Sequence, residues 1–569
     1  MTVTGADALV AALRRAGIRF LYGNTGTTEV PLLDVMAGDD AEPRFILALH
    51  ESQAVAMADG YARATAQPGA VLVHAMAGLT NCLSSLYNAF VDGSPVVILV
   101  GEVDARLQGT GAFLEHENAT TMTRQITKAS WRVERGDRIP EWVARAIRTA
   151  LTPPAGPVVL TIPEDLLYGP AEVGTALEPV GAAPALQGIA PHPGDVERAA
   201  VLLSESGPIA VIAGNEVGAW RAEPALVRLA EVLEAVVVTE MGHIRARLNF
   251  PQDHRAYVGE VGPDAEWDVV AEARTVLGVG CRFFQRRFQD PPYLVAGQRV
   301  IHVHTNPAVL GVPRAPDVAM VADPATALAA LLEALGRRPP EAGERERRRQ
   351  RQAMLRQRWV QRCTTPSAAG GNGLGVTQVI RTLSDVASVA NAVIVDDAVA
   401  SRPFLLRHYD FRVPGTYHSQ GGGILGWGGG AAVGMRMGGA RPVVAVLGDG
   451  CLLYGPQCLW SAARYGVPVV FLVINNRGYV SIKQSLRKLA GGARRTGDYV
   501  GCDLAEPTID MVGLATSLGV EGHRVTSAKD LAPALEKALA SMAPVLLDVI
   551  VGEEEYFAPD STSRVRQGR

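Results

Sequence analysis

One stretch of sequence constrains the fold of this chain more than any other. Residues 443–479 read VVAVLGDGCLLYGPQCLWSAARYGVPVVFLVINNRGY. The apolar, β-branched run Val443–Leu447 predicts a strand buried on both faces, which stops at a Gly-Asp-Gly turn. A helix over Gln457–Tyr465 and a second apolar strand over Val467–Ile474 should follow, ending in an asparagine pair. The stretch therefore predicts a βαβ unit of a parallel sheet.

The ends of these two strands predict a site for a cation and phosphate. In a right-handed βαβ unit both strand ends open on the same edge of the sheet, so Asp449 and Asn476 should face one crevice. A carboxylate and an amide oxygen suit a hard divalent cation that also binds phosphate oxygens. The flanking glycines would let the backbone approach a ligand closely. Taken alone, however, a Gly-Asp-Gly turn is more often a simple chain reversal.

The alternation of helices with apolar strands occurs three times along the 569 residues. Each repetition is typical of a doubly wound parallel sheet. A Pro-, Ala- and Gly-rich stretch at 179–193 and a basic stretch at 336–362 separate them. We therefore predict an α/β protein with three doubly wound parallel-sheet domains, over 1–185, 190–335 and 373–551. A linker (336–372) and a tail (552–569) complete the chain.

Charge and composition exclude several classes of partner. The net charge is −4 and the pI about 6.3, which gives no basic field for nucleic acid or anionic membrane. No apolar run reaches the ~18 residues that a membrane span needs. The basic run 336–362 is interpreted as a solvated helix, and the Gly-Asn-Glu-Val-Gly turn at 214–218 as structural, since it lacks a dinucleotide fingerprint. Six scattered cysteines without CxxC spacing favour reduced thiols and a cytoplasmic protein.

The Gly-Asp-Gly turn at 448–450 and the Asn pair at 475–476 together resemble the diphosphate and metal motif of thiamine diphosphate enzymes. The resemblance implies that thiamine diphosphate and Mg²⁺ are the cofactors. It implies that Asp449, Asn476 and the backbone carbonyl of Gly478 bind Mg²⁺. Four further residues of this motif are expected beside the cofactor: Gly450, Cys451, Tyr479 and Val480.

A second segment of the resemblance concerns the other end of the cofactor. LALHESQAVAMADGYARAT resembles the segment that supplies the family's glutamate, which binds the pyrimidine N1′ and favours loss of the C2 proton. Glu51 is the matching residue, at the end of a predicted strand, Phe45–Leu49. By itself, a carboxylate at a helix start could also simply interact with the helix dipole.

A third segment, PGTYHSQGGGILGWGGGAAVG, resembles the family's turn that bends the cofactor. There Leu425 would act as the wedge, and the Gly423 carbonyl would accept a hydrogen bond from N4′. The alternative is a glycine-rich turn from strand to helix. In VDDAVASRP, Val399 stands where benzoylformate decarboxylase has a threonine, in the segment that relatives use to hold the diphosphate.

The resemblance also implies an oligomer. It implies that 1–185 is a pyrimidine-binding domain, 190–335 a middle domain and 373–551 a diphosphate- and Mg-binding domain. In the known architectures of this class the cofactor lies between the first domain of one subunit and the third domain of another. We therefore expect a homodimer or a dimer of dimers, that is, a homotetramer.

Two sets of residues concern the substrate. YGNTGTTEVPLLD and LVHAMAGLTN resemble benzoylformate decarboxylase around its substrate-binding serine and its first active-site histidine, which implies roles for Thr27 and His74. Gln285 stands near the place of that enzyme's second histidine, which is a departure from the pattern. GTGAFLEHENATTMTRQITKASW and NNRGYVSIKQSL are closer to acetolactate synthases, and they place Phe113, His116, Ser481 and Gln484 near the substrate.

His116 is a candidate proton donor, although a surface histidine is the alternative. The expected reaction is decarboxylation of a small 2-oxo acid through a C2 ylid and an enamine, with release of an aldehyde. The alternative is an acetolactate synthase-like carboligase that joins the acyl carbanion to a second carbonyl compound. A cofactor-binding subunit without turnover is disfavoured because Glu51, Asp449 and Asn476 are all present.

Overall fold

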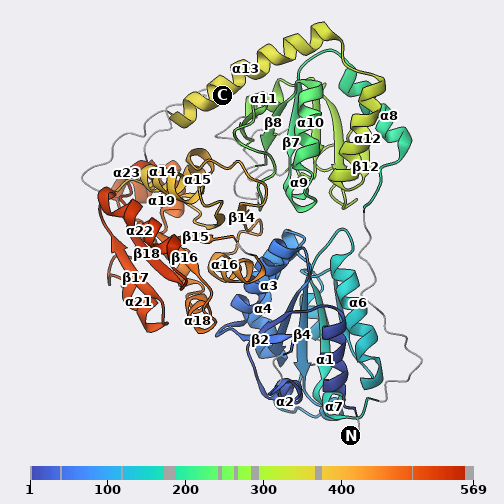
Figure 1. Cartoon of the computed structure of the whole chain (residues 1–569), viewed down its shortest axis with the longest axis vertical. Coiled ribbons are helices and arrows are strands. Elements are labelled where there is room, and N and C mark those ends of the chain that lie inside the picture. The colour runs from blue at the N-terminus through green and yellow to red at the C-terminus, as the bar shows by residue number, and fades with distance from the viewer. Residues whose placement is uncertain are drawn as a thin grey trace.

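The structure, a computed structural model, contains three lobes, each built on a six-stranded parallel sheet (Figure 1). This confirms the predicted α/β class. The structure describes residues 3–38, 41–116, 119–171, 188–240, 246–261, 267–283, 292, 294–364, 374–439, 441–489 and 491–557. In these ranges no helix is both long and apolar enough to cross a lipid bilayer. None of the six cysteines, all of which lie in the described ranges, forms a disulfide bond.

The first sheet has the strand order β2-β1-β3-β4-β6-β5. Alternate residues of its central strands point to opposite faces, so Val71 and Val73 face α3 and α4 while Ala70 and Leu72 face α1 and α6. The elements are β1 (Phe20–Gly23), β2 (Arg44–Leu47), β3 (Gly69–His74), β4 (Val96–Glu102), β5 (Ala129–Arg132), β6 (Val158–Pro163), α1 (Gly5–Arg15), α2 (Val30–Met36), α3 (Glu51–Thr65), α4 (Ala75–Val91), α5 (Ala119–Thr123), α6 (Ile139–Leu151), α7 (Glu164–Tyr168) and the short 3₁₀ helices Thr27–Glu29, Ala105–Leu107 and Gly136–Arg138.

The middle sheet has the order β12-β11-β10-β7-β8-β9. Read from β9, this is the strand order 3-2-1-4-5-6 of dinucleotide-binding folds. The elements are β7 (Ile209–Ala213), β8 (Val236–Thr239), β9 (Tyr257–Glu260), β10 (Thr275–Val279), β11 (Arg299–His304), β12 (Val318–Val321), α8 (Pro193–Ser204), α9 (Asn215–Ala219), α10 (Glu223–Leu233), α11 (Trp267–Ala271), α12 (Pro324–Arg337) and α13 (Ala342–Thr364).

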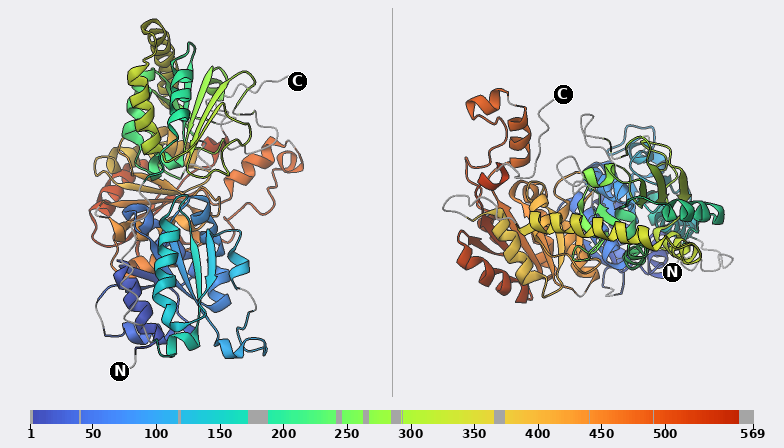
Figure 2. Two further views of the ribbon diagram at one scale, coloured as in Figure 1. Left: turned by 90° about the vertical axis from the view of Figure 1, so that its right-hand side faces the viewer. Right: turned by 90° about the horizontal axis from the view of Figure 1, so that it is seen from above.

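Helix α13 is the basic segment, and it runs along the outside of the middle lobe toward the third lobe (Figures 1 and 2). Several of its arginines bind the middle lobe instead of facing only solvent. Arg348 is buried and donates to the carbonyls of Gly207 and Leu233. Arg349 pairs with Glu234 at 2.9 Å. The positive charge of the helix is therefore partly used within the chain, which a solvated helix would not require.

The third sheet repeats the strand order of the first, as β14-β13-β15-β16-β18-β17. The predicted βαβ unit is present, with β15 and β16 parallel and adjacent. The elements are β13 (Val393–Asp397), β14 (Tyr417–Ser419), β15 (Val443–Gly448), β16 (Val469–Asn475), β17 (Glu521–Val525), β18 (Val545–Ile550), α14 (Val376–Ala387), α15 (Arg402–His408), α16 (Trp427–Gly438), α17 (Asp449–Leu453), α18 (Gln457–Arg464), α19 (Val480–Lys488), α20 (Gly492–Thr496), α21 (Met511–Ser517), α22 (Ala528–Ala540) and α23 (Glu554–Phe557).

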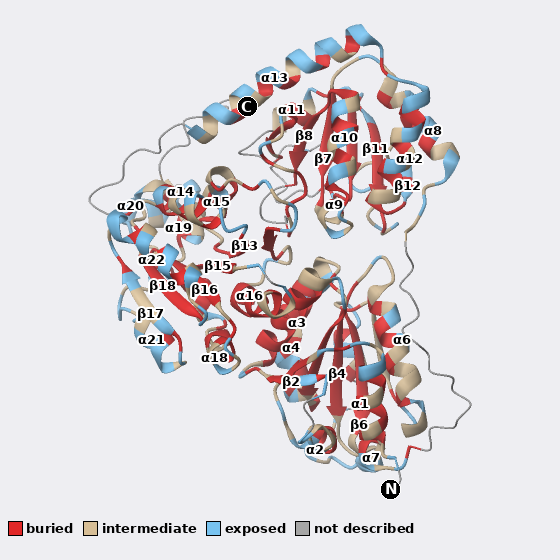
Figure 3. Ribbon diagram, in the orientation of Figure 1, coloured by how far each residue is buried: buried red, intermediate tan, exposed pale blue. Residues whose placement is uncertain are grey.

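Helices α3 and α16 join the first and third lobes, and both are buried over most of their length (Figure 3). Glycines make this close approach possible. A Cβ built on Gly60 would lie 2.1 Å from the Ala431 carbonyl oxygen, and one on Gly434 would lie 1.8 Å from that of Met57. The hydrophobic core of one face of each sheet is continuous across this contact.

A buried charge network sits where the three lobes meet. The Arg63 side chain is 0% exposed; it binds both carboxylate oxygens of Asp59, at 2.7 and 2.9 Å, and Asp92 at 2.8 Å. Its third contact is with the Ser419 carbonyl at 2.7 Å. Burial alone would lower the Arg63 pKa, but the two carboxylates more than offset this and raise it. The middle lobe reaches the same place, because the Ser419 N–H donates to the Ala246 carbonyl.

Removing the charge of Arg63 should destabilise the protein strongly. Arg63→Met keeps much of the side-chain volume but leaves two buried carboxylates without their cation, so we expect a loss of about 3–5 kcal/mol in unfolding free energy. Chemical denaturation measures this. Arg337→Met, which breaks an exposed pair with Glu197, is the control and should change little. Equal denaturation midpoints for Arg63→Met and wild type would contradict the role given to the network.

Candidate active site

The predicted carboxylate and amide converge at the edge of the third sheet. Strand β15 ends at Gly448 and Asp449 begins α17, while Asn476 directly follows β16. The Gly478 N–H donates to Asp449 Oδ2 at 3.1 Å and to Asn476 Oδ1 at 3.2 Å. Since one N–H reaches both oxygens, the two side chains point to the same spot.

The environment of Asp449 suits a divalent cation. The residue is 3% exposed, and burial raises the pKa of its carboxyl to about 6, against the effect of hydrogen bonds from backbone N–H groups including that of Gly450. A bound cation would further stabilise the charged form of a buried carboxylate that otherwise interacts mainly with backbone dipoles. Among the described residues no three His, Cys, Asp or Glu side chains form a metal cluster. A cation here would therefore also need amide, carbonyl and ligand oxygens, as the Asn476 amide and the Gly478 carbonyl would provide.

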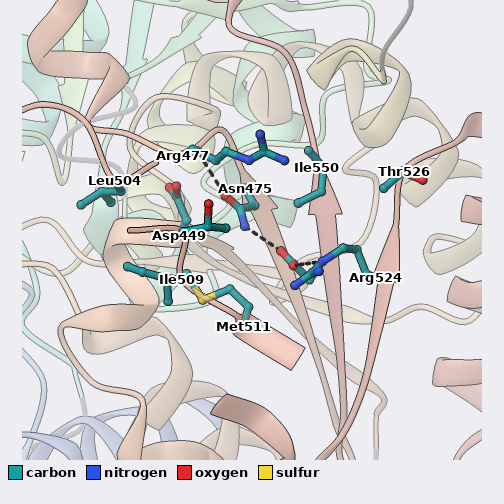
Figure 4. Close-up of a pocket in the computed structure, with 11 residues that line it drawn as sticks. Asp449, Asn475, Arg477, Leu504, Ile509, Met511, Arg524, Thr526 and Ile550 are labelled. Atoms are coloured by element: carbon teal, nitrogen blue, oxygen red, sulfur yellow. Dashed lines mark hydrogen bonds and ion pairs between the residues drawn. The ribbon is translucent and has the colours of Figure 1, made fainter. Parts of the chain in front are cut away.

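A small pocket opens beside Asp449 (Figure 4). Arg524 lines it, but its guanidinium is paired with Asp548 at 3.0 Å and with Asp510 at 2.7 Å. Asn475 also donates to Asp548, at 2.8 Å. The Asp548 carboxylate thus binds two residues that line the pocket. Its ion pair with Arg524 holds this guanidinium away from the Asp449 carboxylate.

The other predicted residues of the motif surround this edge. A Cβ on Gly450 would lie 2.5 Å from the ring of Tyr479, so only glycine allows this contact. Cys451 is buried, and burial raises its thiol pKa well above the ordinary value, which keeps it neutral. Val480 is buried at the start of α19.

The C-terminal end of the described chain also reaches the site. Tyr556, in α23, is buried, and its hydroxyl lies 2.8 Å from Ser401 Oγ and interacts with the Asn476 side chain. No sequence pattern pointed to this tyrosine, which lies in the segment assigned to the tail (552–569).

The glycine-rich turn lies between β14 and α16. Gly423 has φ +80° and a Cβ there would meet nothing within 4 Å, so this glycine is exposed at an open position. Leu425 is half-buried, and so is Val399, in the turn that follows β13. The Asp397 carboxylate, at the end of β13, accepts hydrogen bonds from the backbone N–H groups of Gly426 and Gly428 at 2.9 and 3.1 Å. Burial raises its pKa to about 6.

Glu51 is the first residue of α3, close after the end of β2. It is 7% exposed, and its carboxylate accepts hydrogen bonds from the side-chain amides of Asn24 at 3.3 Å and Asn81 at 2.9 Å. Neither asparagine was predicted from the sequence. They lie inside the segments that resemble the family around Thr27 and His74, but nothing local shows that they reach Glu51.

His74 ends β3, and its ring is oriented by residues next to Thr27. Its Nδ1 lies 2.9 Å from Thr28 Oγ1 and 3.3 Å from Glu29 Oε2. Glu29 also accepts the Gly26 N–H at 2.9 Å, and burial raises its pKa. Thr27 itself is exposed. Thr28 and Glu29 were not predicted, because they lie 46 and 45 positions from His74 in the chain.

The other residues predicted to lie near the substrate are Phe113, His116, Ser481, Gln484 and Gln285. Phe113 is 86% exposed in the single chain, and His116 is exposed on the same loop. Ser481 is half-buried on α19, and the Gln484 amide donates to the Tyr556 carbonyl at 2.6 Å. Gln285 lies outside the described residues.

Comparison with known proteins identifies the family. Three domain profiles of the thiamine pyrophosphate enzymes match the chain: the N-terminal TPP-binding domain over residues 3–122, the central domain over 196–331 and the C-terminal TPP-binding domain over 397–549. Benzoylformate decarboxylase of Pseudomonas aeruginosa is 32% identical over 551 residues, covering 94% of this chain and 97% of the relative. The chain belongs to the thiamine pyrophosphate (thiamine diphosphate) enzyme family.

Other relatives divide between two reactions. A probable acetolactate synthase large subunit of Methanocaldococcus jannaschii is 29% identical over 563 residues, covering 97% of this chain and 92% of the relative. The solved structure of a thiamine diphosphate-dependent 4-hydroxybenzoylformate decarboxylase of Rhodococcus jostii RHA1 superposes with a TM-score of 0.83 at 28% identity, covering 96% and 99% of the two chains. The chain is thus a thiamine diphosphate enzyme of the decarboxylase and acetolactate synthase group, a lyase or carboligase.

In the middle domain of this thiamine diphosphate enzyme the strand order reverses between β7 and β10, the place where a dinucleotide-binding fold would hold phosphate. Glu240 is buried there, and its carboxylate accepts the N–H groups of Asn215 at 3.2 Å and Arg282 at 2.7 Å. Burial raises the pKa of Glu240 to about 7, and that of the neighbouring Glu216 to about 7. The backbone donors that a phosphate would use are therefore bound by the chain's own carboxylate.

Asp449→Ala should lose the Mg²⁺-dependent part of the cofactor affinity. Because the variant lacks a charged ligand of the cation, we expect affinity for thiamine diphosphate with Mg²⁺ to fall by roughly 100-fold. Fluorescence titration with Mg²⁺ removed and restored measures this. Asp530→Ala, an exposed residue of α22, serves as the control. Wild-type affinity in Asp449→Ala would place the cation elsewhere.

Glu240 should make the protein less stable as the pH rises. Between pH 4.5 and about 7 the native state keeps a proton on Glu240 that the unfolded chain has lost, so stability falls with increasing pH over this window. Glu240→Gln cannot titrate, and its unfolding free energy relative to wild type should therefore rise by about 3 kcal/mol between pH 4.5 and 7.5. Denaturation at a series of pH values tests this. A constant difference across the series would show that the Glu240 pKa is not raised.

Proposed function

We propose that this enzyme decarboxylates a small 2-oxo acid and releases an aldehyde, with thiamine diphosphate and Mg²⁺ as cofactors. Asp449, the Asn476 amide and the Gly478 carbonyl would hold the cation, and the Gly423 carbonyl and Leu425 would face the pyrimidine. When bound, thiamine diphosphate supplies the electron sink for breaking the bond to the substrate carboxylate. Glu51, fixed by Asn24 and Asn81, would hold the proton at the pyrimidine N1′.

The orientation of His74 is the observation that supports release of an aldehyde. With its Nδ1 engaged by Thr28 and Glu29, the nitrogen left to exchange a proton with a substrate is Nε2. An aldehyde-forming decarboxylase must deliver a proton to the carbon that has lost CO₂, and a fixed, half-buried histidine at a strand end suits that step. Thr27, exposed beside it, would contact the substrate carboxylate.

The proposed assembly is a homodimer or a dimer of dimers in the cytoplasm. Glu51 lies in the first domain and Asp449 in the third. In the architecture that the family resemblance implies, the cofactor lies between these two domains of different subunits, so the proposed site would combine one domain from each of two subunits. The exposure of Phe113 and His116 in the single chain is consistent with residues that a second subunit would cover.

Carboligation is the second candidate. It is favoured by the acetolactate synthase relatives, which match almost the whole chain. Ser481, Gln484 and His116 lie in the segments that resemble those enzymes. A carboligase would transfer the acyl unit to a second carbonyl compound instead of protonating it.

Product analysis separates the two reactions. The holoenzyme is given benzoylformate or pyruvate, alone and with a second aldehyde, and CO₂ and carbonyl products are measured. We expect one aldehyde per CO₂; a 2-hydroxyketone or an acetohydroxyacid as the main product would favour the carboligase. Glu51→Gln is the control: it should bind the cofactor but release CO₂ about 10²–10⁴-fold more slowly, since it cannot take part in proton transfer. Absence of CO₂ with every 2-oxo acid tested would contradict both candidates.

A further inference from the structure

The glycine-rich turn of the third domain is held by side chains of the first domain of the same chain. The Asp92 carboxylate accepts the Gly421 N–H at 2.9 Å. Gln53 donates to the Gly426 carbonyl at 2.8 Å, and the Trp427 indole N–H donates to Asp59 at 2.7 Å. Hydrogen bonds from α3 and from the residue that follows α4 thus fix both ends of the turn.

Asn88 binds the middle of the turn. This residue of α4 is 0% exposed, and its side-chain amide makes two bonds to one residue, Ile424. Asn88 Nδ2 donates to the Ile424 carbonyl at 2.9 Å, and Asn88 Oδ1 accepts the Ile424 N–H at 3.3 Å. Ile424 stands between Gly423 and Leu425, the two residues of the turn assigned to the cofactor.

These two bonds fix the peptide groups on either side of Ile424. The Ile424 N–H belongs to the same planar peptide unit as the Gly423 carbonyl, and in a trans peptide the two point in opposite directions. When Asn88 Oδ1 holds the N–H, the Gly423 carbonyl oxygen must point away from Asn88. In the same way, the bond to the Ile424 carbonyl fixes the peptide unit that leads into Leu425.

Gly423 needs such a restraint. Its φ of +80° is a backbone conformation that glycine adopts without steric cost. Glycine also adopts many other conformations, and no atom lies within 4 Å of the position of a Cβ on Gly423. Without a partner for the Ile424 N–H, the peptide unit between Gly423 and Ile424 could rotate at little cost. The side-chain amide of Asn88 supplies both a donor and an acceptor, which is what a fixed peptide orientation requires.

We propose that Asn88 is a positioning residue for catalysis: it orients the Gly423 carbonyl and Leu425 of its own subunit toward the aminopyrimidine of the cofactor. The inference rests on the proposed function, because it takes the turn to be the cofactor-bending element. Asn88 acts through the turn and not by contact with the substrate. It should therefore affect the rate at which bound cofactor loses its C2 proton more than it affects cofactor affinity.

The test compares Asn88→Ala with Gln298→Ala. Gln298 is also a buried amide that donates to backbone carbonyls, those of Val270 and Ala273, but it lies in the middle domain. Two quantities are measured: deuterium exchange at C2 of bound thiamine diphosphate, by acid quench and NMR, and amide exchange of residues 419–427 in the cofactor-free protein, by mass spectrometry. Thiamine diphosphate affinity with Mg²⁺ and thermal stability are measured alongside.

In Asn88→Ala we expect C2 exchange to slow by about tenfold or more, because the carbonyl that aligns the reacting group is no longer fixed. Amide exchange of residues 419–427 should become faster, while cofactor affinity changes less than about threefold, since the diphosphate and cation contacts remain. Gln298→Ala should lower thermal stability without changing C2 exchange. C2 exchange within twofold of wild type in Asn88→Ala would overturn the proposal.

Asn88→Asp provides a second variant if Asn88→Ala does not fold. It keeps an acceptor for the Ile424 N–H but loses the donor to the Ile424 carbonyl, so slowed C2 exchange supports the proposal and exchange within twofold of wild type overturns it. Failure of the proposed function is distinguishable: the wild-type protein would then not bind thiamine diphosphate with Mg²⁺. Amide exchange in the cofactor-free protein would still show whether Asn88 holds the turn.

Discussion

The placement of the first and third lobes depends on the buried charge of Arg63. One guanidinium group contacts two carboxylates of the first domain and a backbone carbonyl of the third, and it lies over the ring of Trp427 with its central carbon 4.6 Å from the ring centroid. A buried cation is tolerated only where its hydrogen bonds are satisfied from fixed directions. The lobes can therefore satisfy Arg63 only in this relative arrangement, and the same arrangement brings α4 against the glycine-rich turn.

The first and third sheets have the same strand order, and the two helices that join them follow corresponding strands of the two sheets. Helix α3 follows β2, and α16 follows β14, the matching strand of the third sheet. The contact between them is reciprocal, with a glycine of each helix against the backbone of the other. A self-complementary contact of this kind is familiar from symmetric dimers, and here it lies within one chain. Each helix also begins at a part of the proposed site, Glu51 for α3 and the glycine-rich turn for α16.

The centre of the third sheet could be predicted well from the sequence. Strands β15 and β16 are buried on both faces, so their sequences are continuous apolar runs, and the rules for parallel crossovers bring Asp449 and Asn476 together. The edge strand β2 was predicted, but the edge strands β5 and β17 could not be predicted in this way. In β5 every residue is half-buried and in β17 the residues are mixed, because an edge strand pairs on one side only and lacks a strong apolar pattern.

The residues that orient the functional groups could not be predicted from the sequence either. Asn81 and Asn88 lie on α4, where a polar residue in a helix usually faces solvent, and Glu29 lies in a short turn. Their roles depend on contacts between segments that are far apart in the chain: Asn88 reaches a residue 336 positions away. Local pattern and resemblance identified the groups that would touch the cofactor, whereas the side chains that hold those groups required the packed structure.

The first residues of α3 would belong to two different pockets of the proposed assembly. Glu51 and Gln53 are two positions apart, but in the proposed assembly Glu51 would serve the pocket completed by a neighbouring subunit while Gln53 holds the turn of its own. Defects in the two halves of the pocket would thus belong to different subunits. A hybrid of one subunit damaged at Glu51 and another damaged at Asp449 would contain one pocket with both lesions and one with neither. Two inactive proteins could in this way complement each other when mixed as subunits.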